Sequence, residues 1–282
     1  MVGQKHLLQT IDTLIKNTTF PRFAILSGVK GSGKKLISND IAHKLCDTVI
    51  NIGIKVDDIR EMIKSAYKLT TPCAYIIADA DNMSLAAKNA LLKVTEEPPN
   101  NAYFIMTLQD ANRTLDTIRS RGVVFTMEIY TTVEIEEYIK TNIDYGDNLR
   151  IYMDLCENIG DVIALNSYDV EKFYDYVELV VDNIAVVSGA NSFKIGDKIN
   201  LKNDDTKYDL ILFFRAFIAV CTNRAANEMN AGNKSEMQMF LNWMKITCRY
   251  LRELSINGIN KLSTFDCWLL DIREASFDSS GS

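Results

Sequence analysis

A short stretch rich in glycine and lysine is the part of this sequence best suited to chemistry. Residues 28–35 read Gly-Val-Lys-Gly-Ser-Gly-Lys-Lys, between an apolar run at 23–26 and a helix-like stretch at 36–45. A strand, a glycine-rich loop, a lysine and a helix follow one another in this order in phosphate-binding P-loops. In such loops, backbone N–H groups close around phosphate oxygens, and the helix N-terminus adds a favourable field. The residues predicted to form a degenerate nucleotide-binding loop are Gly28, Gly31, Gly33, Lys34 and Lys35.

One position of this loop does not suit ATP hydrolysis. The residue after the P-loop lysine is normally Ser or Thr, because its hydroxyl holds Mg²⁺. Here it is Lys35, which has no acceptor atom and adds positive charge beside the metal position. The pattern therefore predicts a loop built like a nucleotide site but not equipped for turnover. The alternative is an ordinary glycine turn between a strand and a helix.

A second candidate strand, at 74–78, ends in Asp79-Ala80-Asp81. In P-loop ATPases an apolar strand ends in an Asp for the Mg²⁺ shell, followed by a Glu that polarises the attacking water. By register, Ala78 stands at the metal position and Asp79 at the Glu position. Alanine binds no metal, and Asp is one methylene shorter than Glu. The alternative is that Asp79 and Asp81 cap the next helix, and for Asp81 we favour that interpretation.

Composition and charge indicate an ordinary globular protein. The chain has 282 residues, 47% of them hydrophobic and 24% charged, with a net charge of −6. This length allows two or three domains, and the acidic balance does not favour a generic nucleic-acid binder. We expect neither secretion nor a membrane span, and thus a cytoplasmic location. The six cysteines and two histidines have no metal-ligand spacing, so we expect reduced thiols and no metal site.

Strand and helix signals alternate only up to about residue 127. All four prolines lie in the first 99 residues, and the later stretches show helical periodicity. We expect an α/β domain at 1–127, a small helical domain at 128–188 and a helical domain at 189–282, with a polar linker at 188–205 and a polar tail at 277–282. Two apolar stripes are predicted to be core rather than ligand pocket: Phe213, Phe214, Phe217 and Val220, and Met239, Leu241, Trp243, Met244 and Ile246.

Motifs in the first 127 residues match a known family. They are Val2-Gly3-Gln4, the glycine-rich loop, Val56-Asp57-Asp58-Ile59-Arg60, Asn89-Ala90-Leu91-Leu92-Lys93 running into Glu96-Glu97-Pro98-Pro99, and Thr117-Ile118-Arg119-Ser120-Arg121. The chain resembles the delta-prime type of subunit of bacterial polymerase III clamp loaders, which are AAA+ proteins. This resemblance implies a AAA+ P-loop domain with a parallel sheet and flanking helices. A small helical lid and an all-helical collar for oligomerisation are implied to follow it.

The resemblance also implies roles for individual residues. Arg121 is implied to be an arginine finger that reaches the γ-phosphate held by a neighbouring subunit, although Gly122 replaces the cysteine usual after it. The alternative is that Arg121 only pairs with a surface carboxylate, and we expect such a pair for Arg119. Thr107 stands at the first-sensor position, at the end of a strand. Gly160 stands where ATP-using relatives place a second-sensor arginine. Cys46 stands alone, so the cysteine-rich zinc module usual in the family is absent.

The implied function is that of a non-motor subunit of a DNA replication clamp loader. Such a subunit helps to assemble the AAA+ ring and to load the sliding clamp on DNA. Its implied partners are the motor subunits and a delta-type subunit, with the sliding clamp and primed DNA reached through the complex. No cofactor is required on this reading, and passive binding of ATP or ADP is left open. The alternatives are an active AAA+ ATPase motor subunit, or a helical adaptor that only retains the AAA+ fold.

Overall fold

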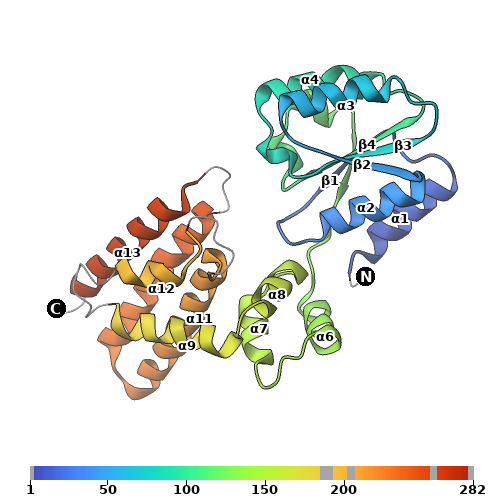
Figure 1. Cartoon of the computed structure of the whole chain (residues 1–282). Coiled ribbons are helices and arrows are strands. Elements are labelled where there is room, and N and C mark those ends of the chain that lie inside the picture. Colours follow the sequence, from blue (N-terminus) through green and yellow to red (C-terminus); the bar gives the residue numbers. More distant parts are fainter. Residues whose placement is uncertain (1–2, 185–192, 202–206, 255–258, 279–282) are drawn as a thin grey trace. The chain divides into compact units, whose positions relative to one another are not determined.

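The structure, a computed structural model, describes residues 3–184, 193–201, 207–254 and 259–278 (Figure 1). The contacts divide the chain into two compact units. One comprises Met1–Glu134 and Asn158–Gly160, and the other comprises Ile135–Glu157 and Asp161–Ser282. Half of the predicted linker, residues 188–192 and 202–205, and the predicted tail from residue 279 onward lie outside the described residues.

A five-stranded parallel sheet forms the centre of the first unit. Its order is β2-β3-β4-β1-β5. The strands are β1 (Phe23–Ser27), β2 (Thr48–Ile52), β3 (Cys73–Ile77), β4 (Ala102–Leu108) and β5 (Val123–Thr126). Strands β1, β3 and β4 are nearly continuous apolar runs, as expected of parallel strands that are covered on both faces. In the middle of the sheet, Ile25 lies opposite Met106 on one side and Val124 on the other.

Helices cover both faces of this sheet (Figure 1). Successive strand residues point to opposite faces, so Phe23 and Ile25 belong to one core, and Ala24 and Leu26 belong to the other. The first core is completed by α3 (Val56–Ala66), α4 (Leu85–Glu96) and α5 (Asp116–Arg119), and the second by α1 (Lys5–Lys16) and α2 (Lys34–Leu45). The α/β P-loop architecture predicted from the sequence is confirmed.

The connections leave β1 and β4 in opposite directions. From β1 the chain passes through α2 to β2 at one edge of the sheet. From β4 it passes through η2 (Ala111–Arg113) and α5 to β5, on the far side of β1. Open parallel sheets bind ligands outside the carboxyl ends of the strands at such a switch point. The loop at residues 28–33 lies there.

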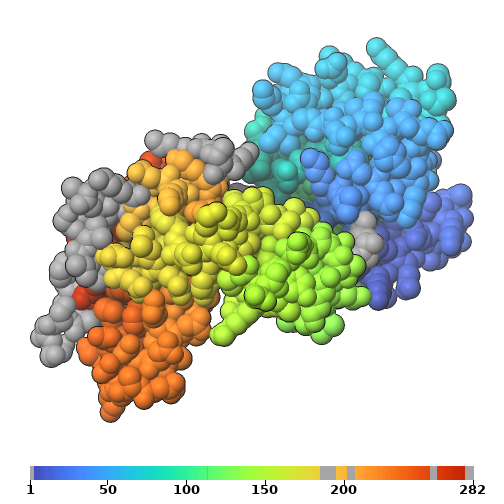
Figure 2. Space-filling model, turned by 60° about the horizontal axis from the view of Figure 1, so that its bottom comes forward, coloured from blue at the N-terminus to red at the C-terminus, as the bar shows by residue number. Residues whose placement is uncertain are grey.

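The second unit is helical. Its helices are α6 (Thr132–Asn142), α7 (Leu149–Leu155), α8 (Ile159–Asn166), α9 (Val170–Asn183), η3 (Phe193–Lys198), α11 (Leu210–Ala231), α12 (Lys234–Leu254) and α13 (Lys261–Asp278), of which α6 and α8 begin in the first unit. Side chains cap several of them: Asp169 accepts from the N–H of Lys172, Asp209 from that of Ile211, and Asn260 from that of Leu262. Figure 2 shows α9 in yellow and α11 and α12 in orange as closely packed side chains. The all-helical character predicted after residue 127 is confirmed.

Aromatic rings fill the core of this helical unit. The ring centroid of Trp268 lies 5.0 Å from those of Phe214 and Phe217, and its Nε1–H donates to Thr247 over 3.0 Å. The core role predicted for the α11 stripe is confirmed. On α12 the prediction is only partly right. Trp243 is buried, but the other fully buried positions of α12 are Phe240, Thr247 and Tyr250, spaced three and four residues apart, and the remaining predicted members are half-buried.

Helix α11 is also long and apolar enough, by length and composition, to cross a membrane. Half of its most apolar window is buried inside the unit. Its apolar character is thus accounted for by packing against α9 and α12.

Candidate nucleotide site

The loop after β1 turns sharply into α2. Gly31 and Gly33 have φ angles of +84° and +88°, which glycine adopts without the clash of a Cβ atom. The N–H of Gly28 donates to the carbonyl of Leu108 over 3.1 Å. A Cβ on Gly28 would lie 2.5 Å from Cβ of Met127. The three predicted loop glycines therefore form one turn, held between the ends of β4 and β5.

The two lysines that follow differ in their surroundings. Lys34 is 8% exposed, and its Nζ donates to the carbonyls of Gly28 and Val29 over 2.6 and 2.8 Å. Burial lowers the pKa of Lys34, and two nearby carboxylates partly offset this effect. The side chain of Lys35 is exposed. No hydroxyl is therefore available at position 35 to hold Mg²⁺.

Asp79 and Thr107 come together at the ends of β3 and β4. The backbone N–H of Asp79 donates to the hydroxyl oxygen of Thr107 over 3.0 Å, and Thr107 is 2% exposed. Asp79 has a φ of +52°, a conformation that Asp tolerates better than most residues. Ala78 is half-buried beside it and offers no carboxylate for a metal. By register, Asp79 stands at the position of the second acidic residue after the strand, and the family resemblance assigns Thr107 to the first-sensor position. This hydrogen bond joins the two positions.

Asp81 does not cap α4, so the interpretation favoured for it is wrong, and the side chain of Asp79 caps no helix either. The cap is Ser84, whose hydroxyl accepts from the N–H of Ala87 over 3.2 Å, as its place before the helix suggested. Asp81 instead accepts from the N–H of Gln109 over 2.7 Å. Its side chain therefore joins η1 (Ala80–Asn82) to the end of β4.

The segment around Gly160 packs directly on the loop. The N–H of Gly160 donates to the carbonyl of Gly31 over 3.2 Å. A Cβ on Gly160 would lie 2.5 Å from Cα of Gly31, and one on Gly31 would lie 2.0 Å from Oδ1 of Asn158. Asn158 is 4% exposed. Position 160 therefore has no room for the side chain of a second-sensor arginine in this conformation.

Sequence analysis missed other contacts around the loop. Tyr130 donates its hydroxyl to the carbonyl of Ser32 over 3.2 Å. Gln4, which is 1% exposed, exchanges two hydrogen bonds with the backbone of Glu128, at 2.6 and 2.8 Å. Gln4 was recognised only as part of a motif, and no local pattern distinguishes Tyr130 or Asn158 from other polar residues.

Arg121 lies in the short connection between the end of α5 and the start of β5. Its guanidinium donates to the carbonyl of Thr117 and forms an ion pair with the carboxylate of Glu96. Arg119 has different partners, donating to Asn112 over 2.7 Å and to Asp116 over 2.8 Å. Both arginines thus pair with carboxylates, and for Arg121 this is the contact that the alternative interpretation predicts.

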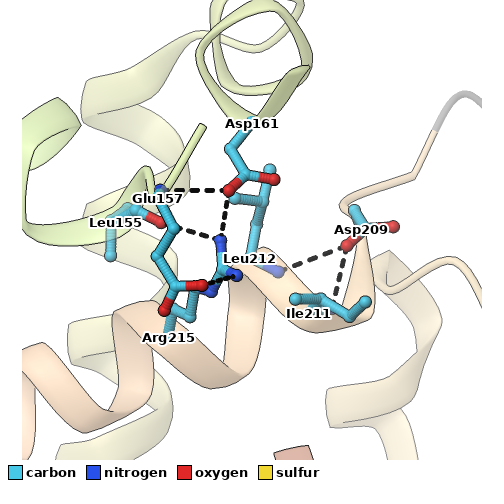
Figure 3. Close-up of polar contacts among 7 residues, drawn as sticks. All are labelled: Leu155, Glu157, Asp161, Asp209, Ile211, Leu212 and Arg215. Atoms are coloured by element: carbon cyan, nitrogen blue, oxygen red, sulfur yellow. Dashed lines mark hydrogen bonds and ion pairs between the residues drawn. The ribbon is translucent and has the colours of Figure 1, made fainter. Parts of the chain in front are cut away.

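Arg215 forms the most buried ion-pair network among the described residues (Figure 3). It belongs to α11 and donates to Asp161 over 2.5 Å, to Glu157 over 2.7 Å and to the carbonyl of Leu155 over 3.2 Å. The side chains of Arg215 and Asp161 are only 15% and 20% exposed. Sequence analysis missed this network, although a lone arginine within the run 213–217 of aromatic and apolar residues was a signal.

These residues fit a bound nucleotide only in part. The glycine turn and Lys34 are suited to phosphate oxygens, but positions 35, 78 and 160 lack the hydroxyl, the carboxylate and the arginine that hydrolysis uses. Among residues whose placement is described, no group of three or more His, Cys, Asp or Glu side chains could hold a metal ion. The glycine turn and Lys34 can cradle an anion.

The sheet order, with the glycine-rich loop after its β1 strand and Thr107 at the end of the adjacent β4, defines a P-loop domain of the AAA+ class. The Holliday junction branch migration motor RuvB of Thermotoga maritima has the same fold. It superposes with a TM-score of 0.51 at 17% identity, covering 77% of this chain and 75% of that one.

Sequence comparisons give a finer assignment. The family described as DNA polymerase III, delta subunit, matches residues 50–130. The DNA polymerase III subunit gamma of Buchnera aphidicola (from Acyrthosiphon pisum) is 26% identical over 75% of this chain and 70% of its own length. Subunit tau of Bacillus subtilis is 26% identical over 68% of this chain, which spans only 40% of that protein. Together these matches support a clamp-loader AAA+ protein.

Proposed function

We propose that the chain is a non-motor subunit, of the delta-prime type, in a clamp loader for DNA replication. It would help to assemble a AAA+ ring and to load a sliding clamp on primed DNA, together with motor subunits and a delta-type subunit, in the cytoplasm. The match of residues 50–130 to a delta-subunit family and the relatives named gamma and tau support this role. The division into an AAA+ domain at 1–127, a lid at 128–188 and a collar at 189–282 is part of the proposal.

The observation that carries the non-motor role is the contact between Gly160 and Gly31. A second-sensor arginine would have to occupy the space that the loop backbone already fills, 2.5 Å from the Cβ position. Lys35 and Ala78 stand at the two positions where a Mg²⁺ ligand is expected, and neither side chain offers an oxygen. Three departures at one site are what we expect of a site released from hydrolysis. No cofactor is then required, and ATP or ADP would bind at most passively.

The catalytic contribution of the chain in this proposal is Arg121. An arginine directed at the nucleotide site of its own chain has no reaction to accelerate if that site is inactive. An arginine at the edge of the domain can instead reach a phosphate held by a neighbouring subunit. Such fingers stabilise the charge that develops as phosphate leaves, and are worth roughly 10³–10⁵ in rate in well-studied GTPases. Arg121 keeps 27% of its side chain exposed, which suits a role toward a second subunit.

An active ATPase motor subunit is the second candidate. The buried Lys34 and the hydrogen bond between Asp79 and Thr107 favour it, because both features belong to working P-loop sites. A helical adaptor that retains the fold only by inheritance is the third possibility, and failure to assemble with motor subunits and a sliding clamp would favour it.

Mg²⁺-dependent ATP turnover by the purified chain separates the first two candidates. We expect no turnover above a Lys34→Ala control, because positions 35 and 78 hold no Mg²⁺. Turnover by the unmodified chain that Lys34→Ala abolishes would establish the motor interpretation and contradict ours. Calorimetric titration with ADP in the same buffer would then report whether the loop binds nucleotide passively.

A further inference from the structure

The tip of Arg121 is held by two acceptors from separate helices. One is the carboxylate of Glu96 at the end of α4, and the other is the carbonyl of Thr117 in α5. Arg119, only two residues away, contacts neither of them. The contact of Glu96 is therefore specific to one of two neighbouring arginines.

The position of Glu96 is electrostatically unusual. Helix α4 ends at Glu96, with Glu97 as its C-cap, and the C-terminus of a helix carries partial negative charge that disfavours carboxylates. The positive charge of Arg121 offsets this for Glu96. Glu97 is exposed and has no ion pair within the described part of the chain. Of two adjacent acids at the same unfavourable place, only one reaches the arginine.

The backbone that carries Arg121 is fixed as well. Its N–H donates to the carbonyl of Ile118 over 3.1 Å. The next residue, Gly122, packs so closely that a Cβ would lie 2.8 Å from the ring of Phe23 and 2.9 Å from the side chain of Ile25. The departure from the family's cysteine at position 122 thus brings the chain against β1. Both ends of the arginine are anchored, its backbone by this packing and its tip by Glu96 and Thr117.

We propose that Glu96 is a positioning residue for Arg121, an inference that rests on the proposed trans role of the arginine. A guanidinium has five N–H donors, and two of them are occupied by these acceptors. The remaining donors are available for phosphate oxygens of a nucleotide on a neighbouring subunit. Holding the long side chain in one orientation removes conformational freedom that it would otherwise lose on reaching the phosphate. The ligand class is a nucleoside triphosphate bound in trans.

The test uses the complete complex, assembled with motor subunits, sliding clamp and primed DNA. Glu96→Gln keeps the size of the side chain but removes its charge, and we expect a roughly three- to tenfold fall in kcat for ATP with an unchanged KM. Glu97→Gln is the matched control and should leave kcat unchanged. The charge-swapped double variant, Glu96→Arg with Arg121→Glu, restores an ion pair between the two positions but leaves no arginine at position 121. It should assemble and melt like the unmodified protein while remaining as slow as Arg121→Ala.

The outcomes distinguish this inference from the function on which it rests. If Arg121→Ala slows the complex while Glu96→Gln matches Glu97→Gln or speeds hydrolysis, Glu96 does not position the arginine, and the trans role stands. If Arg121→Ala itself hydrolyses ATP at the unmodified rate, both ideas are overturned. A charge-swapped complex that recovers full activity would show that the pair is only structural, and would likewise overturn the positioning role.

Discussion

The backbone N–H of Gly160 donates a hydrogen bond to the carbonyl oxygen of Gly31, 3.2 Å away, at the apex of the phosphate-type loop. The two residues are more than 120 positions apart in the chain, and neither has space for a side chain at the contact. A loop that is built like a phosphate-binding loop is therefore contacted by the first turn of α8.

Gly160→Arg restores, by register, the residue that ATP-using relatives place here, but it should not restore function. Its Cβ would lie 2.5 Å from Cα of Gly31, so we expect a loss of roughly 1–3 kcal/mol in stability, as for overpacked sites. Amide hydrogen exchange of residues 28–34 should become faster, because the turn is displaced from the loop. Ile163→Arg, at a position of α8 that is 55% exposed, is the control and should leave exchange in the loop unchanged. Equal exchange in the two variants would argue against the close packing seen here.

Arg215→Ala should destabilise the helical unit by about 3 kcal/mol, because it removes the guanidinium that forms the ion pair with the half-buried carboxylate of Asp161. Arg224→Ala, in the same helix, removes an ion pair with Asp182 whose side chains are 37% and 51% exposed, and should cost about 0–1 kcal/mol. Both tryptophans of the chain lie in this unit, so urea unfolding followed by tryptophan fluorescence reports on it. Similar midpoints for the two variants would show that the Arg215 network is not stabilising.

The cysteines should differ in their reactivity toward a disulfide reagent at pH 8. Burial raises the pKa of Cys46 to about 11 and that of Cys156 to about 12, so both remain protonated, and the thiolate is the reactive form. Cys267 is exposed and Cys248 is half-buried. We expect Cys267 to react first, Cys248 next, and the buried thiols only after unfolding. Rapid modification of all six thiols in the native protein would contradict the burial described here.

The parts of this protein that the sequence predicts are those set by local patterns. The apolar runs at 23–26 and 74–78 predicted buried strands, Ser84 predicted a helix cap, and the glycine spacing predicted the loop. The sequence also predicts that positions 35 and 78 hold no Mg²⁺, because neither Lys nor Ala offers an oxygen ligand, and this stays a prediction.

The parts that escaped prediction depend on contacts distant in sequence. Asp81 precedes a helix, and the local pattern favoured it as the cap of that helix. Because β3 and β4 are neighbours in the sheet, Asp81 instead lies near the end of β4 and accepts from the N–H of Gln109. The replacement at Gly160 was visible by register, but its steric cause, the backbone of Gly31, was not. On α12 the predicted stripe missed Phe240 and Tyr250, because the packing of α11 and α13 selects which face is buried.

The central claim is that this chain does not hydrolyse ATP itself but supplies Arg121 to a neighbouring site. The most direct test is the ATPase rate of the reconstituted clamp-loader complex carrying Arg121→Ala, with Arg119→Ala as the matched control. Both variants should fold and assemble, since each loses only a partly exposed ion pair. We predict a fall of at least about tenfold in the rate of the Arg121→Ala complex, because finger arginines stabilise transition-state charge, and a small change for Arg119→Ala. An Arg121→Ala complex that hydrolyses ATP and loads clamps at the unmodified rate would contradict the account.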